Sequence, residues 1–491
     1  MGLTYLTGRP GGPGRRALLK TMAIAACAAG TALGGAGAAA PVITATTATA
    51  ATTTANPVAA LNALVLHGGP GIIRINRVAA DDPPTSDQCQ QQYKVACYDP
   101  AQLQLAYNLP ALYNQNISGR GRTIAIVDVF GSPTISGDLT QFDTAFNLPA
   151  PPSFKIIAPA GRIPRYNKNN ADMVGWAGET TLDVEWAHAI APDANILVVE
   201  VPESRDGNFI TQAISAENYV VKHHMADVIG QSFGGAEQAA GPINSLRYAY
   251  QNAQKNHITV LASSGDTGAA NTGLDGKTYY TYPTASWPAT DPLVTAVGGT
   301  NLNLNTAGGR NSADTAWNDT YNKSVQQFVF NSSGPNPLAT GGGKSVHFSR
   351  PSYQNSVKSK VGGSRGIPDI SMSASCAGSV NVYQSYGGLQ AGWYAVCGTS
   401  ESTPMFAGIV ALAAQKAGHD LGLINPALYQ LAAERAPGIV QVTSGNNTVS
   451  FRQHGRKYTV RGYSAGRGYN RVAGLGTINA QDFVLELAKL G

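Results

Sequence analysis

A serine in the C-terminal part of the chain has the sequence context of a nucleophile. Ser400 follows Gly398 and Thr399, and an apolar, Ala-rich run begins shortly after it. A glycine turn that leads into a helix pushes a hydroxyl out of the backbone at the helix N-terminus, where free N–H groups can stabilise negative charge. This context predicts that the Ser400 hydroxyl attacks a carbonyl group, a role that needs a base to take its proton.

Two carboxylates four residues apart supply the best candidate base. At about 100° per residue, Glu179 and Asp183 share one helical stripe with large apolar side chains, so we expect the pair to face inward. An acid pair at this spacing more often lies on a solvated helix face. Two acids inside an apolar stripe favour a functional role instead, because burial of unpaired carboxylates is costly. His188, the nearest imidazole in the sequence, falls about half a turn away from Glu179.

A third acid, Asp266, follows a predicted buried strand in the segment Ser263-Ser264-Gly265-Asp266-Thr267-Gly268. Sites in open α/β sheets form at the carboxyl ends of such strands. The same pattern is equally typical of a turn aspartate that accepts hydrogen bonds from its own backbone. The residues alone leave both interpretations open.

Taken in order, these three segments resemble the motifs of the sedolisin family of serine-carboxyl peptidases, which are acid-acting relatives of subtilisin. The resemblance runs from about Thr123 to the C-terminus and includes the segments 124–128 and 231–234. It implies a role for each acid and for the serine: Ser400 as nucleophile, Glu179 as general base, Asp183 as its partner, Asp266 as the acid of the oxyanion hole, and Asp128 as a supporting acid that does not contact substrate.

A serine activated by carboxylates suits acid conditions. A histidine base is protonated well below its reference pKa of about 6.5, whereas a carboxylate with a pKa of about 4 still accepts a proton. An aspartic acid in an oxyanion hole can donate a hydrogen bond only while it is protonated. We therefore expect an acid endopeptidase whose rate is largely lost by neutrality.

Segments with strand and helix patterns alternate along the chain, which predicts βαβ units and a parallel sheet covered by helices. With the resemblance, this gives an α/β, subtilisin-like three-layer fold with a mainly parallel central sheet. The expected strands are 123–128, 195–201, 226–232, 258–263 and 293–298, and the expected helices lie near 179–191, 208–222, 244–256 and 403–417.

The N-terminal sequence predicts export. Residues 1–40 have the twin-arginine pattern of a signal peptide, with Arg15 and Arg16 before a short, weakly apolar run. An uncleaved anchor is the alternative, but the run is rich in Gly and Ala and short for a membrane span. We expect a Thr/Ala-rich linker and short N-terminal extension over 41–98, a peptidase domain over 99–491, and a secreted, extracellular product that does not contact a membrane after cleavage.

The formal charge of +5 includes four basic residues and no acidic residue before Pro41, which leaves +1 after signal cleavage. This balance gives no argument for a nucleic-acid partner. The expected partners are protein or peptide substrates, and the protein is expected to be a monomer.

Four cysteines remain after loss of the signal peptide, an even number that predicts two disulfides in an exported chain. Three connectivities are possible, and free buried thiols are the alternative. We expect the local pairs, Cys89 with Cys97 and Cys376 with Cys397.

The sequence departs from the sedolisin family where that family builds a calcium cradle from two carboxylate-bearing segments. Gln441 and Asn470 stand at the positions of the two carboxylates. Because calcium prefers charged oxygen ligands, we expect no bound calcium, and no other cofactor.

Two other functions remain open. An ordinary Ser-His-Asp protease would use His188, which lies on another helix face, and the chain has no His-Gly-Thr signature. A secreted, non-catalytic binding protein on the same fold would have no reason to keep all four of Glu179, Asp183, Asp266 and Ser400.

Overall fold

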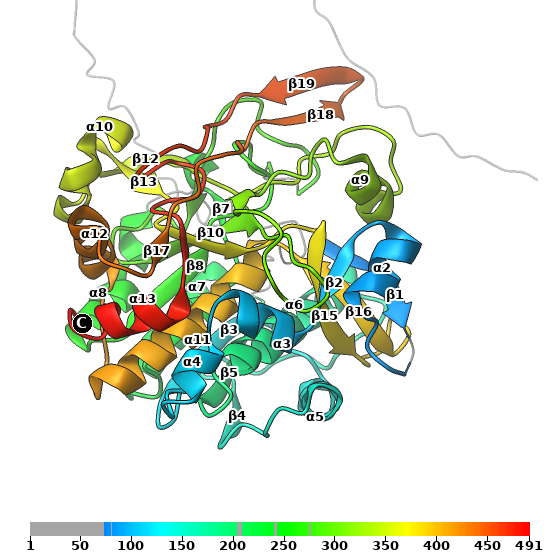
Figure 1. Cartoon of the computed structure of the whole chain (residues 1–491), viewed down its shortest axis with the longest axis horizontal. Coiled ribbons are helices and arrows are strands. Elements are labelled where there is room, and N and C mark those ends of the chain that lie inside the picture. The colour runs from blue at the N-terminus through cyan, green and yellow to red at the C-terminus, as the bar shows by residue number, and fades with distance from the viewer. Residues whose placement is uncertain (1–72, 80, 204–208, 240–242, 274–275) are drawn as a thin grey trace, which may run out of the picture. The chain divides into compact units, whose positions relative to one another are not determined.

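A mainly parallel β-sheet lies at the centre of the fold in this computed structural model, which describes residues 73–79, 81–203, 209–239, 243–273 and 276–491 (Figure 1). The predicted signal peptide and most of the predicted linker lie outside the described residues. Within them, eight strands form the sheet, in the order β11-β10-β8-β6-β3-β5-β4 with β14 beside β10. The strands are β3 (Thr123–Val129), β4 (Phe154–Ile157), β5 (Asn195–Val201), β6 (Val228–Gln231), β8 (Thr259–Ser263), β10 (Thr295–Asn301), β11 (Thr315–Ala316) and β14 (Ile370–Ser373).

The short strand β11 is antiparallel to β10, and the other neighbours in this sheet are parallel. In register, Val127 of β3 lies opposite Val199 of β5, and Ile126 lies opposite Gly230 of β6. The carboxyl ends of β3, β6 and β8 therefore meet at one edge of the sheet. All five predicted strands are present with bounds shifted by at most a few residues.

Helices cover both faces of the sheet, and the side chains of β3 show how the layers are divided. Ile124 and Ile126 pack in one hydrophobic cluster, whereas Ala125 and Val127 pack in another, as the alternation of side chains along a strand requires. The first cluster includes α6 (Ala171–Ile190) and α11 (Thr399–Ala417), with α3 (Pro100–Ala106), α4 (Pro110–Tyr113), α5 (Ile135–Phe146), α12 (Asn425–Glu434) and α13 (Ala480–Leu487). The second includes α7 (Ile210–Lys222) and α8 (Tyr248–Lys255). This confirms the predicted three-layer fold.

Helix α6 is longer and more deeply buried than the sequence pattern predicted. It begins at Ala171, where the side chain of Asn170 accepts hydrogen bonds from the backbone N–H groups of Asp172 and Met173. Every residue from Trp176 to Ile190 is buried. The expectation of a single inward stripe was wrong, because β3, β15, α5 and α11 together surround the helix. Position on the helical wheel therefore does not separate exposed from buried side chains here.

A second sheet, in the order β1-β16-β15-β2, lies in the part of the fold that leads to Ser400. Its strands are β1 (Ile73–Ala79), β2 (Ala96–Tyr98), β15 (Gly378–Gln384) and β16 (Gly392–Cys397), and α2 (Ser86–Tyr93) precedes β2. Residues 73–98 thus contribute strands to the same unit as the predicted peptidase domain. The disulfides Cys89–Cys97 and Cys376–Cys397 are both present, which confirms the expected local pairing.

Shorter elements form loops and hairpins around the sheets. They are β7 (Gly235–Ala236), η2 (Glu237–Ala239), η3 (Ile243–Leu246), β9 (Ser286–Trp287), α9 (Lys323–Phe330), β12 (Gly343–Ser349), η4 (Ser352–Val357), α10 (Lys358–Val361), β13 (Ser364–Ile367), β17 (Ile439–Val440), β18 (Val449–Gln453), β19 (Arg456–Val460) and β20 (Thr477–Ile478). Among the described helices, none combines the length and apolar character that a membrane crossing requires.

Candidate active site

Ser400 is the second residue of α11 and follows a sharp turn out of β16. Gly398 at this turn has a φ of 124°, a conformation that side-chain-bearing residues rarely adopt, and its N–H donates to the Ala374 carbonyl at 2.9 Å. The adjacent Cys376–Cys397 disulfide ties the end of β16 to the chain just beyond Ala374. Strand, turn and disulfide together fix the start of the helix. Ser400 itself is 1% exposed.

Asp266 lies directly beside Thr399, the residue that precedes Ser400. Its Oδ1 accepts two hydrogen bonds from Thr399, one from the backbone N–H and one from the hydroxyl, each 2.7 Å long. The Gly265 N–H in turn donates to the Thr399 hydroxyl oxygen at 3.2 Å. The other oxygen, Oδ2, is buried and has no hydrogen-bond partner among the described residues. Burial raises the pKa of Asp266 to about 7, although the two bonds from Thr399 oppose this rise.

The other three predicted acids gather at the same edge of the sheet. Glu179 and Asp183 project from α6, and Asp128 is the penultimate residue of β3. Ser232, which directly follows β6, donates to Asp183 Oδ1 at 3.0 Å. Asp128 and Glu179 are fully buried, and Asp183 is 1% exposed. The structure thus places the acids together, in the interior of the protein.

Crowding of these acids affects their protonation. Burial raises the pKa of Asp183 well above its usual range, and the nearby charges of Asp128 and Glu179 raise it further. The Ser232 hydroxyl acts in the opposite direction, because it stabilises the ionised form. Burial also raises the pKa of Asp128 to about 7. In acid, some of these carboxyl groups are therefore protonated, and the cluster carries fewer negative charges than it has carboxyl groups.

Helices α6 and α11 run in the same direction across the sheet. Helix α6 connects the parallel strands β4 and β5, so it runs opposite to them. Helix α11 begins beside Asp266 at the carboxyl edge of β8, and Asp420, just beyond its end, pairs with Arg122 at the amino end of β3 at 3.1 Å. Both helices therefore begin near the carboxyl edge of the sheet.

The packing of these helices brings Ser400 level with Glu179. A side-chain carbon on Gly408 of α11 would lie 3.3 Å from the Ala187 carbonyl oxygen of α6, so the backbones approach closely there. Ser400 lies eight residues before Gly408, and Glu179 lies eight residues before Ala187. Eight residues span about 12 Å of helix axis. Counted back from the contact between Gly408 and Ala187, Ser400 and Glu179 therefore lie at similar positions along two helices that run in the same direction. The predicted nucleophile and the predicted base consequently lie at the same end of adjacent helices.

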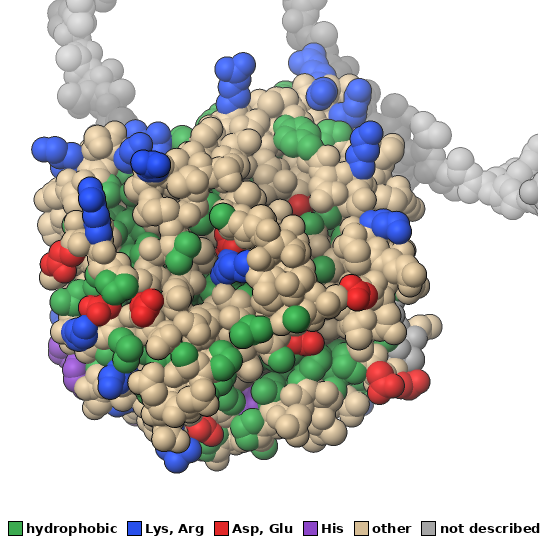
Figure 2. Space-filling model, in the orientation of Figure 1, with side chains coloured by type: hydrophobic (Ala, Val, Ile, Leu, Met, Phe, Trp, Pro, Cys, Tyr) green, Lys and Arg blue, Asp and Glu red, His purple; other side chains and the backbone are tan. Residues whose placement is uncertain are grey.

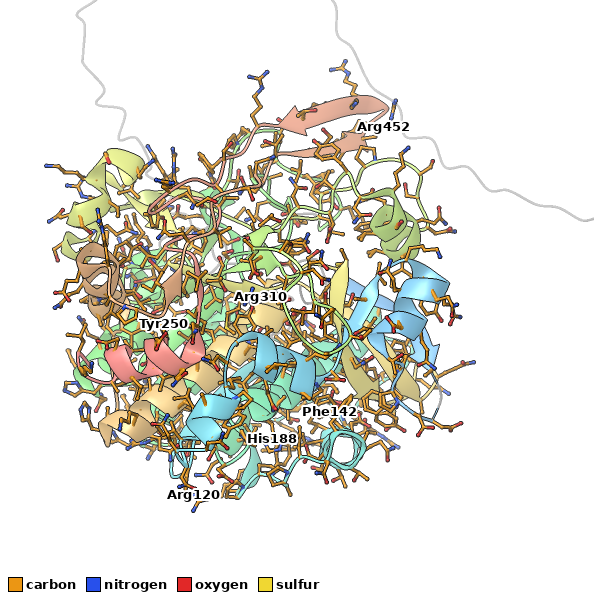
Figure 3. The ribbon with its side chains drawn as sticks, in the orientation of Figure 1. Arg120, Phe142, His188, Tyr250, Arg310 and Arg452 are labelled. Carbon is orange, nitrogen blue, oxygen red and sulfur yellow. A yellow bond between two sulfur atoms is a disulfide. The ribbon has the colours of Figure 1, made fainter. Side chains whose placement is uncertain are left out.

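His188 is held in a different part of the interior. Its Nε2 lies 2.8 Å from the Pro149 carbonyl oxygen and 3.3 Å from Asp143 Oδ1 on α5. It follows Glu179 by nine residues, about 13 Å along the helix axis. Figure 3 shows it in the lower half of the view, where α5 also lies. The arrangement places His188 at the contact between α5 and α6.

Three further residues of the site received no role from the sequence. Thr399 orients Asp266, and Ser232 bonds Asp183, although both lie inside motifs that were noted. Glu401, the residue after Ser400, is fully buried. Burial raises the pKa of Glu401 well above its usual range, and the charge of Asp266 raises it further, whereas the Ser373 hydroxyl lowers it. The only signal for Glu401 in the sequence was an acid two residues before the start of the expected apolar helix at 403.

The loop where sedolisins would hold calcium does not fit the ion. Gln441 Oε1 accepts from the Gly468 N–H at 2.5 Å. The side-chain amide nitrogen of Asn470 lies 3.3 Å from the carbonyl oxygens of Val442 and Gly466 and 3.5 Å from that of Gly468. These oxygens thus face an amide donor, and no carboxylate joins them. Nowhere among the described residues do three or more His, Cys, Asp or Glu side chains form a group suited to a metal.

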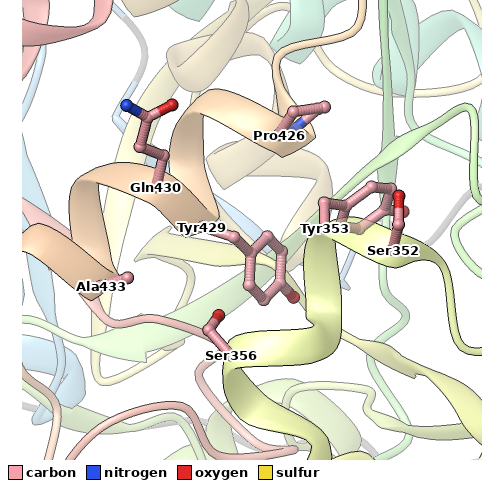
Figure 4. A pocket seen from close by; sticks show the side chains of 7 residues that line it. All are labelled: Ser352, Tyr353, Ser356, Pro426, Tyr429, Gln430 and Ala433. Atoms are coloured by element: carbon pink, nitrogen blue, oxygen red, sulfur yellow. The ribbon is translucent and has the colours of Figure 1, made fainter.

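A pocket of about 360 Å³ lies between η4 and α12, away from these acids (Figure 4). Tyr429 of α12 and Ser356 of η4 face each other across it, and Tyr353 lines the same side as Ser356. Its lining has hydroxyl, phenol and amide groups but no carboxylate or imidazole, so it offers no general base at ordinary pH: Ser352, Tyr353, Ser356, Pro426, Tyr429, Gln430 and Ala433.

Comparison with known proteins agrees with this architecture. The sequence model of the subtilase family matches residues 165–453, more than half of the chain, and the chain belongs to that family. Its relatives place it among the sedolisins. It is 31% identical to kumamolisin from Bacillus sp. (strain MN-32) over 390 residues, and 30% identical to sedolisin from Pseudomonas sp. (strain 101) over 381 residues. These alignments cover 77% and 75% of this chain, but only 62% and 59% of the two relatives.

A solved structure gives the same result for the fold. Pseudomonas sedolisin, described as a serine-carboxyl proteinase in complex with two molecules of pseudo-iodotyrostatin, matches with a TM-score of 0.64 at 27% identity. The match covers 80% of this chain and 99% of that chain. The predicted sedolisin relationship and subtilisin-like fold are therefore confirmed.

Proposed function

We propose that this protein is an acid-acting serine-carboxyl endopeptidase that hydrolyses peptide bonds in protein or peptide substrates. The observation that carries the proposal is the placement of Asp266, held by Thr399 through one oxygen while its other oxygen has no hydrogen-bond partner among the described residues. A carboxyl group fixed in this way next to a serine can donate a hydrogen bond to an oxyanion once it is protonated.

In the proposed mechanism, Ser400 Oγ attacks the scissile carbonyl carbon while Glu179 takes the hydroxyl proton. Asp183, whose pKa is raised by burial and by its acidic neighbours, retains its proton, so that the negative charge of the pair resides on Glu179. Asp266 donates a hydrogen bond to the developing oxyanion. Glu179 then returns the proton to the leaving amine, and a water molecule repeats the sequence to release the acyl group from Ser400.

The export pattern of residues 1–40 and the two disulfides support secretion, since disulfides persist in oxidising compartments. We propose a secreted, extracellular monomer that does not bind a membrane after loss of the signal peptide. Mass spectrometry of the protein recovered from culture medium tests the cleavage site before Pro41, and light scattering tests the monomer.

Hydrolysis of acid-denatured protein, measured as kcat/KM across the pH range, tests the activity. We expect a maximum in acid that Ser400→Ala abolishes while the folded structure remains. His188→Ala serves as the control: it removes the contact with Asp143 and lowers stability, but the correctly folded variant should keep most of its activity. An optimum above neutrality that depends on His188 would instead support a Ser-His-Asp protease.

A further inference from the structure

A β-hairpin formed by β18 and β19 carries a concentration of positive charge. Between Glu434 and Asp482 the sequence has no Asp or Glu, but it has seven Lys and Arg residues. Five exposed basic residues on or next to the hairpin are called the cationic hairpin here: Arg452, His454, Arg456, Lys457 and Arg461. None of the five forms an ion pair with a described residue.

The positive charge of the hairpin is visible on the surface, although the net charge of the sequence did not indicate it. Figure 2 shows Lys and Arg side chains gathered at the top of the view, where Figure 1 places β18 and β19 and Figure 3 places Arg452. The charge of +1 expected for the mature chain gave no sign of it, because acidic residues elsewhere in the sequence offset it.

Two of these cations directly oppose each other. Arg452 of β18 is in register with Lys457 of β19, and both are exposed. Like charges at directly opposed positions of an antiparallel pair repel and destabilise it. The neighbouring pair, Phe451 and Tyr458, points the other way and packs with rings 5.7 Å apart. The outer face of the hairpin thus keeps a repulsive pair that an anion could bridge.

The inner face of the hairpin is fixed to the loop that carries Asp266. The Ala269 N–H, three residues beyond Asp266, donates to the Asn447 carbonyl at 2.9 Å just before β18. A side-chain carbon on Gly268 would meet Val449 at 2.4 Å, so loop and strand are in close contact. Phe451 packs on Tyr279 with ring centroids 5.0 Å apart. The strand that carries Arg452 therefore packs at its base against the loop that follows Asp266.

We propose that the cationic hairpin binds ionised Asp and Glu side chains of a polypeptide that lies across the active site, so that the enzyme prefers acidic substrates. This inference rests on the proposed function and adds the class of substrate. Arg452 can engage a carboxylate through two parallel N–H groups, and Lys457 adds a second charge at the same height. Substrate carboxylates between them would replace repulsion with attraction.

The proposal requires ionised carboxylates on the substrate and a protonated Asp266, and both conditions hold over one range of pH. Substrate carboxylates are ionised above about pH 4. Asp266, whose pKa is about 7, is protonated below that value. Among the described residues, the titratable groups in contact with the hairpin from elements packed against it are the phenols of Tyr279 and Tyr321.

Matched fluorogenic peptides test the proposal. Each has the same cleavable core, with a tail of aspartates or of asparagines at one end or the other, and kcat/KM is measured near pH 5.5 at low salt, about midway in that range. We expect wild type to favour an aspartate tail by about three- to tenfold, the effect of two exposed ion pairs. The preference should fall at high salt and below about pH 4, as the carboxylates are screened or protonated.

Charge removal at the hairpin provides the decisive variant. Arg452→Gln with Lys457→Gln should bring the ratio of the two peptides close to one while leaving kcat/KM for the asparagine-tailed peptide unchanged. Because the repulsive pair is gone, the melting temperature should stay the same or rise. The control, Lys222→Gln with Lys255→Gln, removes the same charge from exposed positions at the ends of α7 and α8 and should keep the preference.

Binding of labelled peptides to Ser400→Ala, followed by fluorescence anisotropy, separates this inference from the proposed function. If wild type cleaves no peptide but Ser400→Ala binds the aspartate tail through the hairpin, the peptidase proposal fails and the binding surface stands. Equal binding of both tails, or an equal loss of preference in the control variant, overturns the inference. Binding of inorganic polyphosphate at the hairpin without preference for aspartate tails also overturns it, and would indicate a surface for phosphate polymers.

Discussion

Asp266 accepts both available hydrogen bonds of Thr399 through a single carboxylate oxygen, Oδ1, at 2.7 Å each. This pairing fixes the plane of the carboxyl group relative to the start of α11 and leaves Oδ2 as the natural position for a proton. Because Thr399 is adjacent to Ser400, the orientation of the Asp266 carboxyl group and the position of the Ser400 hydroxyl depend on the same turn.

The alkaline limit of the rate should follow the ionisation of Asp266. Its pKa of about 7 means that the proton is present in acid and is lost as pH rises through about 7. Asp266→Asn cannot ionise but keeps a donor, so we expect a lower kcat at the optimum and a shallower fall above it. Full pH profiles of kcat for both proteins provide the measurement. An unchanged alkaline limb in the variant would assign that limb to another group.

The acid pair and the serine should behave as a unit. Glu179→Gln and Asp183→Asn preserve shape but remove a carboxylate, and each should lower kcat by several orders of magnitude, as should Ser400→Ala. The double variant of Glu179 and Ser400 should be little slower than either single variant, because the same step is already lost. Single-turnover kinetics on one peptide substrate measures these effects.

Glu185 is a matched control for that experiment. It is also fully buried on α6, but it accepts a hydrogen bond from the Tyr383 N–H at 3.1 Å rather than joining the acids at the sheet edge. Glu185→Gln should change stability while kcat stays within about tenfold of wild type, the scale of indirect effects on positioning. Near wild-type turnover in a folded Glu179→Gln protein would exclude Glu179 as the base.

Stability should decrease as pH rises. Asp128 is fully buried with a pKa of about 7, compared with about 3.9 in an unfolded chain. Its contribution to stability is complete below about pH 4 and is lost as pH rises through about 7, because the folded state then has to bury a charge. At about 1.4 kcal/mol per pKa unit, the loss amounts to several kcal/mol.

Urea unfolding at a series of pH values measures this effect. Asp128→Asn should make the free energy of unfolding less dependent on pH between about 4 and 7, the two pKa values that bound the change. Asp82→Asn, at an exposed position, should leave the dependence as it is in wild type. Equal slopes for Asp128→Asn and wild type would show that this carboxyl group does not hold a raised pKa.

Chelation should leave the melting temperature nearly unchanged, because Gln441 and Asn470 close their loop with amide groups. Gln441→Asp with Asn470→Asp removes those donors and supplies carboxylates, so the variant should lose stability in EDTA and regain it with rising calcium. Thermal unfolding of both proteins across calcium concentrations measures the difference. A large fall in the melting temperature of the unmodified protein in EDTA, reversed by calcium, would show that the amides ligate the ion.

Much of the central fold could be predicted because its strands carry strong local signals. The apolar run at 195–201 matches β5 to the residue, since a strand buried on both faces has few polar positions to blur its limits. Helix α11 was expected from 403 but begins at Thr399, because the first turn contains Ser400 and Glu401, which are polar in sequence yet buried in the site. The ends of an element were least predictable where function places polar groups inside.

Features that depend on distant segments could not be predicted. The helical wheel set His188 apart from Glu179 by face, whereas the structure separates them along the axis and by the packing of α5. The bonds from Thr399 to Asp266 join residues 133 positions apart in the chain. The sheet that β1 and β2 form with β15 and β16 likewise joins residues 73–98 to residues 378–397, and no local pattern specifies such a pairing.

The side-chain amide of Asn470 holds the loop near Gln441 through hydrogen bonds that do not depend on pH in the acid range. A cradle of carboxylates would hold its ion less tightly as pH fell, because protons compete with calcium for the ligands. Asn470 has no proton to gain in that range, and its contacts with the carbonyl oxygens of Val442 and Gly466 draw on no external supply. The half-life of the folded protein in acid should therefore not depend on the calcium concentration of its surroundings.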